Sequence, residues 1–146
     1  MKYLLDTNIC IALIRQKPAS LLEKIAQHTV ADIGVSSITV AELQYGVYRS
    51  QRPAQNEQAL ALFLLPLTIL DFDYSAAVAY GRLRPALEAQ GVPIGSLDLL
   101  IAAQAVSRGL TVVTNNVREF ARVPGLSVED WSQGHNRSDA GAQHAG

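Results

Sequence analysis

The stretch YLLDTN, residues 3 to 8, is an apolar run that stops abruptly at a carboxylate, Asp6, before apolar residues resume at Ile9. A short and continuously apolar run is typical of a strand that is buried on both faces of a sheet. Asp6 then stands where this strand ends and a helix begins. Related junctions occur in SSITVAEL (36 to 43), GSLDLLIAA (95 to 103) and VVTNNVREF (112 to 120).

Strand-like and helix-like segments alternate outward from this first junction. Strands are predicted at 2–6, 32–37, 68–72, 110–114 and 126–130. Helices are predicted at 8–16, 19–28, 39–50, 55–65, 74–90, 96–108 and 115–120, with Pro85 expected to kink or split the fifth. Such alternation with short apolar strands predicts an α/β fold in which helices cover both faces of a parallel sheet.

The composition fits one compact domain that meets a partner. At 146 residues the chain is long enough for one well-buried domain, and its charged fraction of 17% is low beside 49% hydrophobic residues, so some apolar surface is expected to meet a partner. The apolar stretch 60–70 is too short to span a membrane and contains Pro66. The N-terminus lacks the apolar core of a secretory signal, and Cys10 is the single cysteine, so we expect a cytoplasmic protein.

Each polar junction has a purely structural interpretation. Asp6 would cap the first helix, because Asp is among the preferred N-cap residues. Thr39 with Glu42 fits a Thr-x-x-Glu capping box, and Asn116 with Glu119 fits a looser Asn-x-x-Glu version. Asp98 would face the positive end of its own helix dipole. Taken singly, each of these residues is explained by helix capping.

Together, the junctions favour a metal site. The carboxyl ends of parallel strands share one edge of the sheet, where Asp6 and Thr114 end strands and Glu42, Asp98 and Asn116 lie near helix starts. Clustered carboxylates repel one another unless a cation neutralises them, and oxygen ligands select hard cations such as Mg²⁺ or Mn²⁺. A divalent ion there polarises a phosphate and activates water, which is the apparatus for phosphodiester hydrolysis.

The same residues carry a family resemblance. LLDTN, Glu42 in ITVAELQYG, PIGSLDLLIAAQA, and VVTNNVREF before VPGLSVEDW resemble the PIN domains of the VapC toxin group over residues 2 to 131. The resemblance implies a PIN-like fold with a central five-stranded parallel sheet. It also implies a metal-dependent endoribonuclease with Mg²⁺ as cofactor, which Mn²⁺ replaces, acting as the dimeric toxin of a toxin–antitoxin pair.

The resemblance also assigns roles to individual residues. It makes Asp6, Glu42 and Asp98 the metal-binding acids and Thr114 a supporting hydroxyl. PIN domains often place a fourth acid where this chain has Asn116, so either Asn116 or Glu119 completes the metal site. The partner implied is a VapB-like antitoxin, whose C-terminal segment places a basic side chain near the acids.

The net charge of −1 argues against binding nucleic acid by bulk positive charge, so local cations are required. The candidates for contacts with RNA are Arg82, Arg84 and Arg118. A near-neutral chain suggests recognition of a small structured RNA, and some VapC-like toxins cut tRNA in the anticodon region. The domain organisation expected is a PIN domain over 1–131 and a disordered tail over 132–146, which has no apolar residue larger than Ala.

Two alternatives remain open from the sequence. An aspartate-dependent phosphohydrolase also begins with a strand and an aspartate, but it places a second Asp two residues on, where this chain has Asn8. A non-catalytic α/β binding module would keep the acids only as helix caps. Binding of Mn²⁺ separates this module from the nuclease, because caps alone bind no ion.

Overall fold

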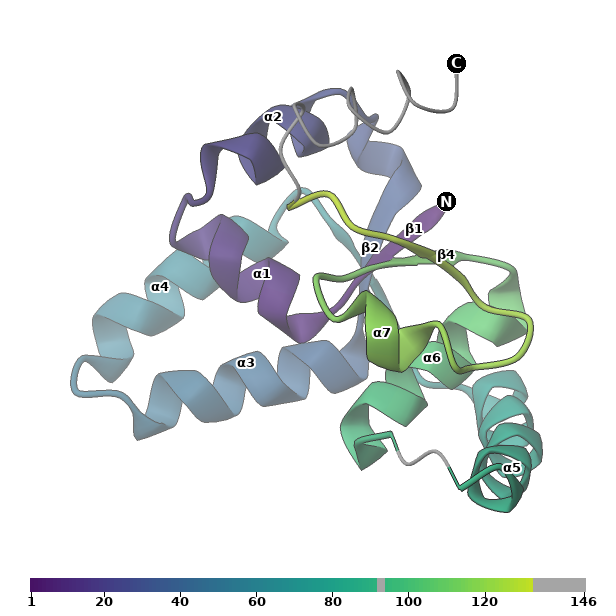
Figure 1. Cartoon of the computed structure of the whole chain (residues 1–146). Helices are drawn as coiled ribbons and strands as arrows, with labels where there is room; N and C mark the ends of the chain where they lie inside the picture. Colours follow the sequence, from purple (N-terminus) through teal and green to yellow (C-terminus); the bar gives the residue numbers. More distant parts are fainter. Residues whose placement is uncertain (92–93, 133–146) are drawn as a thin grey trace, which may run out of the picture.

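A computed structural model describes residues 1–91 and 94–132 of the chain. Five parallel strands form a sheet in the order β3-β2-β1-β4-β5, which confirms the predicted α/β class (Figure 1). The strands are β1 Tyr3–Leu5, β2 Ile33–Ser36, β3 Thr68–Leu70, β4 Thr111–Val113 and β5 Ser127–Glu129. Because β1 lies in the centre, the acid that follows it lies in the middle of the carboxyl edge of the sheet.

The helices follow the predicted ranges to within two residues at each end. They are α1 Thr7–Ile14, α2 Ala19–Ala26, α3 Ser37–Arg49, α4 Pro53–Leu64, α5 Tyr74–Ala89, α6 Ser96–Arg108 and α7 Val117–Phe120. A short 3-10 segment, Val30–Asp32, was not predicted. No described helix is long and apolar enough to cross a membrane. The disordered tail was predicted over 132–146, and residues 133–146 lie outside the described part of the chain.

Successive strand residues pack into two separate hydrophobic cores, one on each face of the sheet. Leu4 and Val112 are fully buried against α5 and α6, whereas their neighbours Leu5 and Val113 are buried against α1, α3 and α4. Successive side chains of a strand point to opposite faces, so a strand covered on both sides must be apolar at every position. This is why YLL and TVV carry no charged or amide side chain.

The prediction that Pro85 splits its helix is wrong. The helix α5 runs from Tyr74 to Ala89 with Pro85 inside it. Leu83 and Leu87 of this helix are buried, whereas Pro85 is exposed. On the solvent side of a helix, the unsatisfied carbonyl group one turn before a proline is hydrated by water, so the packed face stays continuous.

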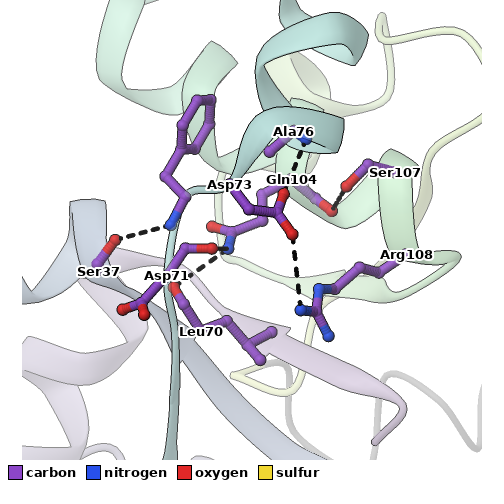
Figure 2. Close-up of polar contacts among 9 residues, drawn as sticks. Ser37, Leu70, Asp71, Asp73, Ala76, Gln104, Ser107 and Arg108 are labelled. Carbon is purple, nitrogen blue, oxygen red and sulfur yellow. Dashed lines mark hydrogen bonds and ion pairs between the residues drawn. The ribbon is translucent and has the colours of Figure 1, made fainter.

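The edge strand β3 is fixed to the rest of the fold by side chains of α3 and α6 (Figure 2). Fully buried Gln104 donates its Nε2 to the carbonyl oxygens of Leu70 at 3.1 Å and Asp71 at 2.9 Å. The backbone N–H of Phe72 donates to Ser37 Oγ at 3.1 Å. These bonds satisfy the backbone where β3 ends and join α6, which carries Asp98, to the sheet.

Candidate active site

Asp6 lies at the centre of the site and also caps a helix. Its Oδ1 accepts a hydrogen bond from the backbone N–H of Ile9 at 2.9 Å, and the residue is only 3% exposed. Burial raises the pKa of Asp6, and the negative charge of Glu42 adds to this rise. Hydrogen bonds from Thr114 and from the N–H of Ile9 act in the opposite direction. The predicted cap is therefore confirmed, and it fixes a buried carboxylate at the sheet edge.

Thr114 stands beside Asp6 because β1 and β4 pair in register, with Leu5 opposite Val113. The fully buried Thr114 hydroxyl hydrogen-bonds the carboxylate of Asp6. The same oxygen accepts the backbone N–H of Asn116 at 2.8 Å. Thr114 therefore orients Asp6 and also fixes the turn that leads into α7.

Glu42 reaches the site from the second turn of α3. Its Oε1 accepts a short hydrogen bond, 2.6 Å, from the hydroxyl of Thr7, which lies 3.4 Å from the hydroxyl of Thr39. The predicted capping box of Thr39 and Glu42 is wrong, because α3 starts earlier and its N-cap is Ser36, which accepts from the N–H of Ile38 at 3.0 Å. Glu42 is thereby left free of a capping role, and its partner comes from the first turn of α1.

Asp98 and Glu119 face each other from the first turns of α6 and α7. Their carboxyl groups hydrogen-bond each other, and the pKa of Asp98 is raised to about 7 by burial first, then by this bond and the charge of Glu119, and then by Asp6 and Glu42. The Oε1 atom of Glu119 is buried without a hydrogen-bond partner. Asp98 thus feels Asp6, Glu42 and Glu119 at once, so all four acids lie within electrostatic reach of one another.

The second predicted capping box, Asn116 with Glu119, is also wrong. The backbone N–H of Asn116 that such a box would bind is donated to Thr114, and the exposed Asn116 side chain makes no cap bond. Glu119 turns instead toward Asp98. The geometry therefore gives the carboxylate of Glu119 a place in the acid cluster and leaves the amide of Asn116 at its rim.

The donor set of this cluster is oxygen only, which fits a hard divalent cation. The Oε1 atom of Glu119 is buried without a partner, and burial followed by neighbouring negative charge raises the pKa of Asp6 and of Asp98. A cation at this position would relieve both conditions. In the described part of the chain, no three His, Cys, Asp or Glu side chains are already arranged around one point that could hold an ion. In this structure, Glu42 accepts a hydrogen bond from Thr7, and Asp98 is paired with Glu119.

The three predicted RNA-contacting arginines lie outside the acid cluster. Arg82 and Arg84 are exposed on α5, where Arg84 Nε pairs with Glu88 at 3.1 Å and its Nη1 donates to the hydroxyl of Tyr80 at 3.0 Å. Arg118 is exposed on α7, next in sequence to Glu119. Arg118 is therefore the predicted cation that lies nearest to the acids along the chain.

A groove of about 400 Å³ opens beside Glu42, between α1, α3 and α4. Its lining combines apolar side chains with two arginines, namely Ile11, Ile14, Arg15, Leu43, Val47, Arg49 and Leu60. Gly46 lines it as well, and no atom would lie within 4 Å of a Cβ added there. The groove thus adjoins the candidate site at Glu42, one of the predicted metal-binding acids.

Two residues near the acids were missed from the sequence. Thr7 follows Asp6 directly, and a signal for it was present, because a hydroxyl in the first turn of a helix can reach the helix packed beside it. Asp130 follows β5 in the way that Asp6 follows β1, and its charge also raises the pKa of Asp6. That strand-end position was the available signal for Asp130.

Comparisons with known proteins show which family the chain belongs to. Residues 3–126 match the PIN domain family. The chain is 46% identical over 132 residues to the tRNA(fMet)-specific endonuclease VapC of Shigella flexneri, covering 90% of this chain and 99% of that protein. It is also 46% identical over 136 residues to ribonuclease VapC2 of Rickettsia felis, covering 91% of this chain and all of that protein.

Solved structures show the same fold. The DNA-bound VapBC of Salmonella typhimurium matches with a TM-score of 0.85 at 44% identity, over 90% of this chain and 98% of that one. VapBC2 of Rickettsia felis, bound to a DNA fragment from its promoter, matches with a TM-score of 0.81 at 45% identity, over 90% and 99% of the two chains. By sequence and fold, this chain belongs to the PIN domain family and, within it, to the VapC ribonucleases.

Proposed function

We propose that the chain is a Mg²⁺-dependent endoribonuclease toxin that hydrolyses phosphodiester bonds of a structured RNA, with tRNA as the substrate class. The observation that carries the proposal is the convergence of Asp6, Glu42 and Asp98 from β1, α3 and α6. Burial raises the pKa of Asp6 and of Asp98, and the charge of Glu42 adds to both rises. The tRNA class rests on the relative from Shigella flexneri, which is named as specific for tRNA(fMet).

The roles of the residues follow from their positions. Asp6, Glu42 and Asp98 would hold the ion, with Glu119 supplying a further carboxylate and Asn116 a neutral amide. When bound, Mg²⁺ would polarise the scissile phosphate and lower the pKa of a coordinated water. Thr114 keeps the Asp6 carboxylate turned into the site, and Thr7 does the same for Glu42. Asp6 and Glu42 are thereby each preorganised by a hydroxyl group of a neighbouring element.

Arginine side chains outside the acid cluster would make the contacts with RNA. Arg118 is exposed beside Glu119, where it would bind a phosphate near the scissile bond. Arg82 and Arg84 on α5 would bind a more distant part of a folded RNA. Because these cations are few, an RNA of defined shape is favoured over a long unstructured polymer.

The partner proposed is a VapB-like antitoxin, as in the VapBC complexes of the relatives. Its C-terminal segment would occupy the groove between α1, α3 and α4 and bring a basic side chain to Glu42. Exposed apolar side chains of α3, of α4 and of the residue that follows α4 support a protein partner near these helices, namely Tyr45, Tyr48, Leu62 and Leu65. We further propose a homodimeric toxin that acts in the cytoplasm.

The phosphohydrolase alternative gains no support. It requires an acid two residues after Asp6, and this position is Asn8, whose side chain is exposed. The binding-module alternative required acids that serve only as caps, but Glu42 and Glu119 cap no helix. The first alternative therefore lacks its second acid, and the second leaves Glu42 and Glu119 without the capping role that it requires.

The test compares Asp6→Asn and Asp98→Asn with Asp71→Asn, which removes an exposed charge at the end of β3. Purified proteins are incubated with total tRNA and Mg²⁺, and new 5′ ends are sequenced. Wild type and Asp71→Asn are expected to produce the same cleavage sites, whereas Asp6→Asn and Asp98→Asn produce none. Cooperative thermal melting of these two variants would show that they remain folded. Retained cleavage in both site variants would overturn the assignment of the metal site.

A further inference from the structure

Asp130 occupies the same row of the sheet as Asp6 and Thr114. Leu5 is paired with Val113, and Val113 with Glu129, so the residues that follow these three form the next row. Two backbone bonds extend the ladder into that row, from Asp6 N to Val113 O and from Thr114 N to Glu129 O, both 3.0 Å. Residues in one row of a parallel sheet point to the same face, and β1 and β5 are separated by two strand spacings, about 10 Å.

The carboxylate of Asp130 is held in place by its own turn. Its Oδ1 accepts hydrogen bonds from the backbone N–H of Ser132 at 2.8 Å and from the Ser132 hydroxyl at 2.5 Å. The Ser132 carbonyl accepts in turn from Ser20 Oγ of α2 at 2.9 Å. Asp130 is thus part of a segment that is tied to a neighbouring helix.

Trp131, which lies between Asp130 and Ser132, anchors this segment in the core. Trp131 is 1% exposed, its ring is stacked on His28 at 4.2 Å, and Tyr3 of β1 packs edge-on at 4.9 Å. The indole N–H donates to Glu129 Oε1 at 2.8 Å. Since Trp131 packs against β1 and α2, the preceding residue is placed at the sheet edge by rigid neighbours and does not depend on a free chain end.

On the side of the site formed by β4, α7 and β5, Thr114 and Asn116 are neutral and Glu119 is paired with Asp98, whereas Asp6, Glu42 and Asp98 belong to other elements. Asp130 is the carboxylate that the ladder places on this side, and its charge acts on Asp6, whose pKa it helps to raise.

We propose that Asp130 is a positioning residue of the metal site, which would act on the divalent ion through a coordinated water and add negative charge on the β5 side of the site. The Oδ1 atom of Asp130 is already held by Ser132, and two strand spacings separate its backbone from that of Asp6, so a contact through water is favoured over direct coordination. The inference rests on the proposed metal-dependent function and adds to it a residue whose charge strengthens binding of the ion.

The test is a calorimetric titration of the folded protein with Mn²⁺, comparing Asp130→Asn with Asp71→Asn and Asp6→Asn. Both Asp130 and Asp71 follow a strand two places from β1, on opposite sides, so the two variants remove the same charge from the same edge of the sheet. Asp130→Asn keeps an oxygen acceptor for Ser132. We expect about tenfold weaker Mn²⁺ binding in Asp130→Asn, the usual effect of an outer-shell change, and less than about a twofold change in Asp71→Asn.

Fluorescence of Trp131, the single tryptophan of the chain, reports whether the segment stays docked. If Asp130→Asn loses this signal, Asp130→Ser repeats the test, because its hydroxyl oxygen also accepts from the Ser132 N–H. Mn²⁺ affinity equal to that of Asp71→Asn, in a docked variant, would overturn the inference. Retained binding in Asp6→Asn would instead overturn the proposed metal site itself, so the two failures are distinguishable.

Discussion

Glu119→Gln is expected to stabilise the metal-free protein above neutral pH, although it removes a partner of Asp98. In the folded protein the pKa of Asp98 is raised from 3.8 to about 7, and the bond and charge of Glu119 are causes second only to burial. An amide at position 119 removes that charge and donates a hydrogen bond to ionised Asp98, so the pKa of Asp98 falls toward its ordinary value.

The sign follows from proton linkage. Between about pH 4 and about pH 7 the folded protein binds more protons at Asp98 than the unfolded chain does, so the free energy of unfolding falls as pH rises. Above about pH 7 the loss is complete. The rise in pKa would correspond to about 4 kcal/mol in full, but Asp98 is half-buried, and solvent screening reduces the expected effect to roughly 1–2 kcal/mol.

Urea unfolding of EDTA-dialysed protein at pH 5 and pH 8 measures the effect. Wild type should lose stability between the two pH values relative to Glu119→Gln, and the variant should exceed wild type at pH 8 by roughly 1–2 kcal/mol. Asp71→Asn controls for the change in net charge. A variant that is less stable than wild type by the same amount at both pH values would refute the reasoning.

Three further changes test the contacts that hold the site and the core. Thr7→Val should weaken Mn²⁺ binding by about tenfold, because Glu42 loses its hydroxyl donor. Thr7→Ser keeps the hydroxyl group and should bind Mn²⁺ as wild type does, so equal affinities in the two variants would contradict this role. Gln104→Leu should lower the free energy of unfolding in urea by about 1–3 kcal/mol, because two backbone carbonyl groups lose their donor, and an unchanged midpoint would disprove it. Phe120→Ala should cost about 3–5 kcal/mol in the same assay, because the fully buried ring leaves a cavity beneath α7, and a smaller loss would mean that the site collapses.

The fold class could be predicted because its signals are local. Runs such as YLL and TVV must be strands covered on both faces, and the period of the helices between them is visible in the sequence. The acids Asp6 and Asp98 could be selected because each interrupts an apolar run at a strand end or a helix start. Helix ends were less accurate, because the cap of α3 depends on which of several hydroxyl residues turns toward the first N–H groups, and Ser36 does so in place of Thr39.

The partners of the acids depend on contacts between distant segments. Thr7 reaches Glu42 across 35 positions of the chain, and Gln104 reaches Leu70 across 34. Glu119 fits two roles equally well by sequence spacing, and the folded chain places its carboxyl group beside that of Asp98. No periodicity within one segment encodes such pairs, since they follow from where two packed helices place their side chains.

The sequence by itself determined the alternating elements, the parallel sheet and the edge at which its acids gather, because hydrophobic period and strand-end polarity act over a few residues. The tertiary structure alone decided the strand order β3-β2-β1-β4-β5, which places Asp6 between Glu42 and Thr114 and brings Asp130 into its row. The physical reason is that burial and electrostatic coupling depend on distance in space. A carboxylate therefore acquires its raised pKa only when the fold removes it from water and brings other charges near.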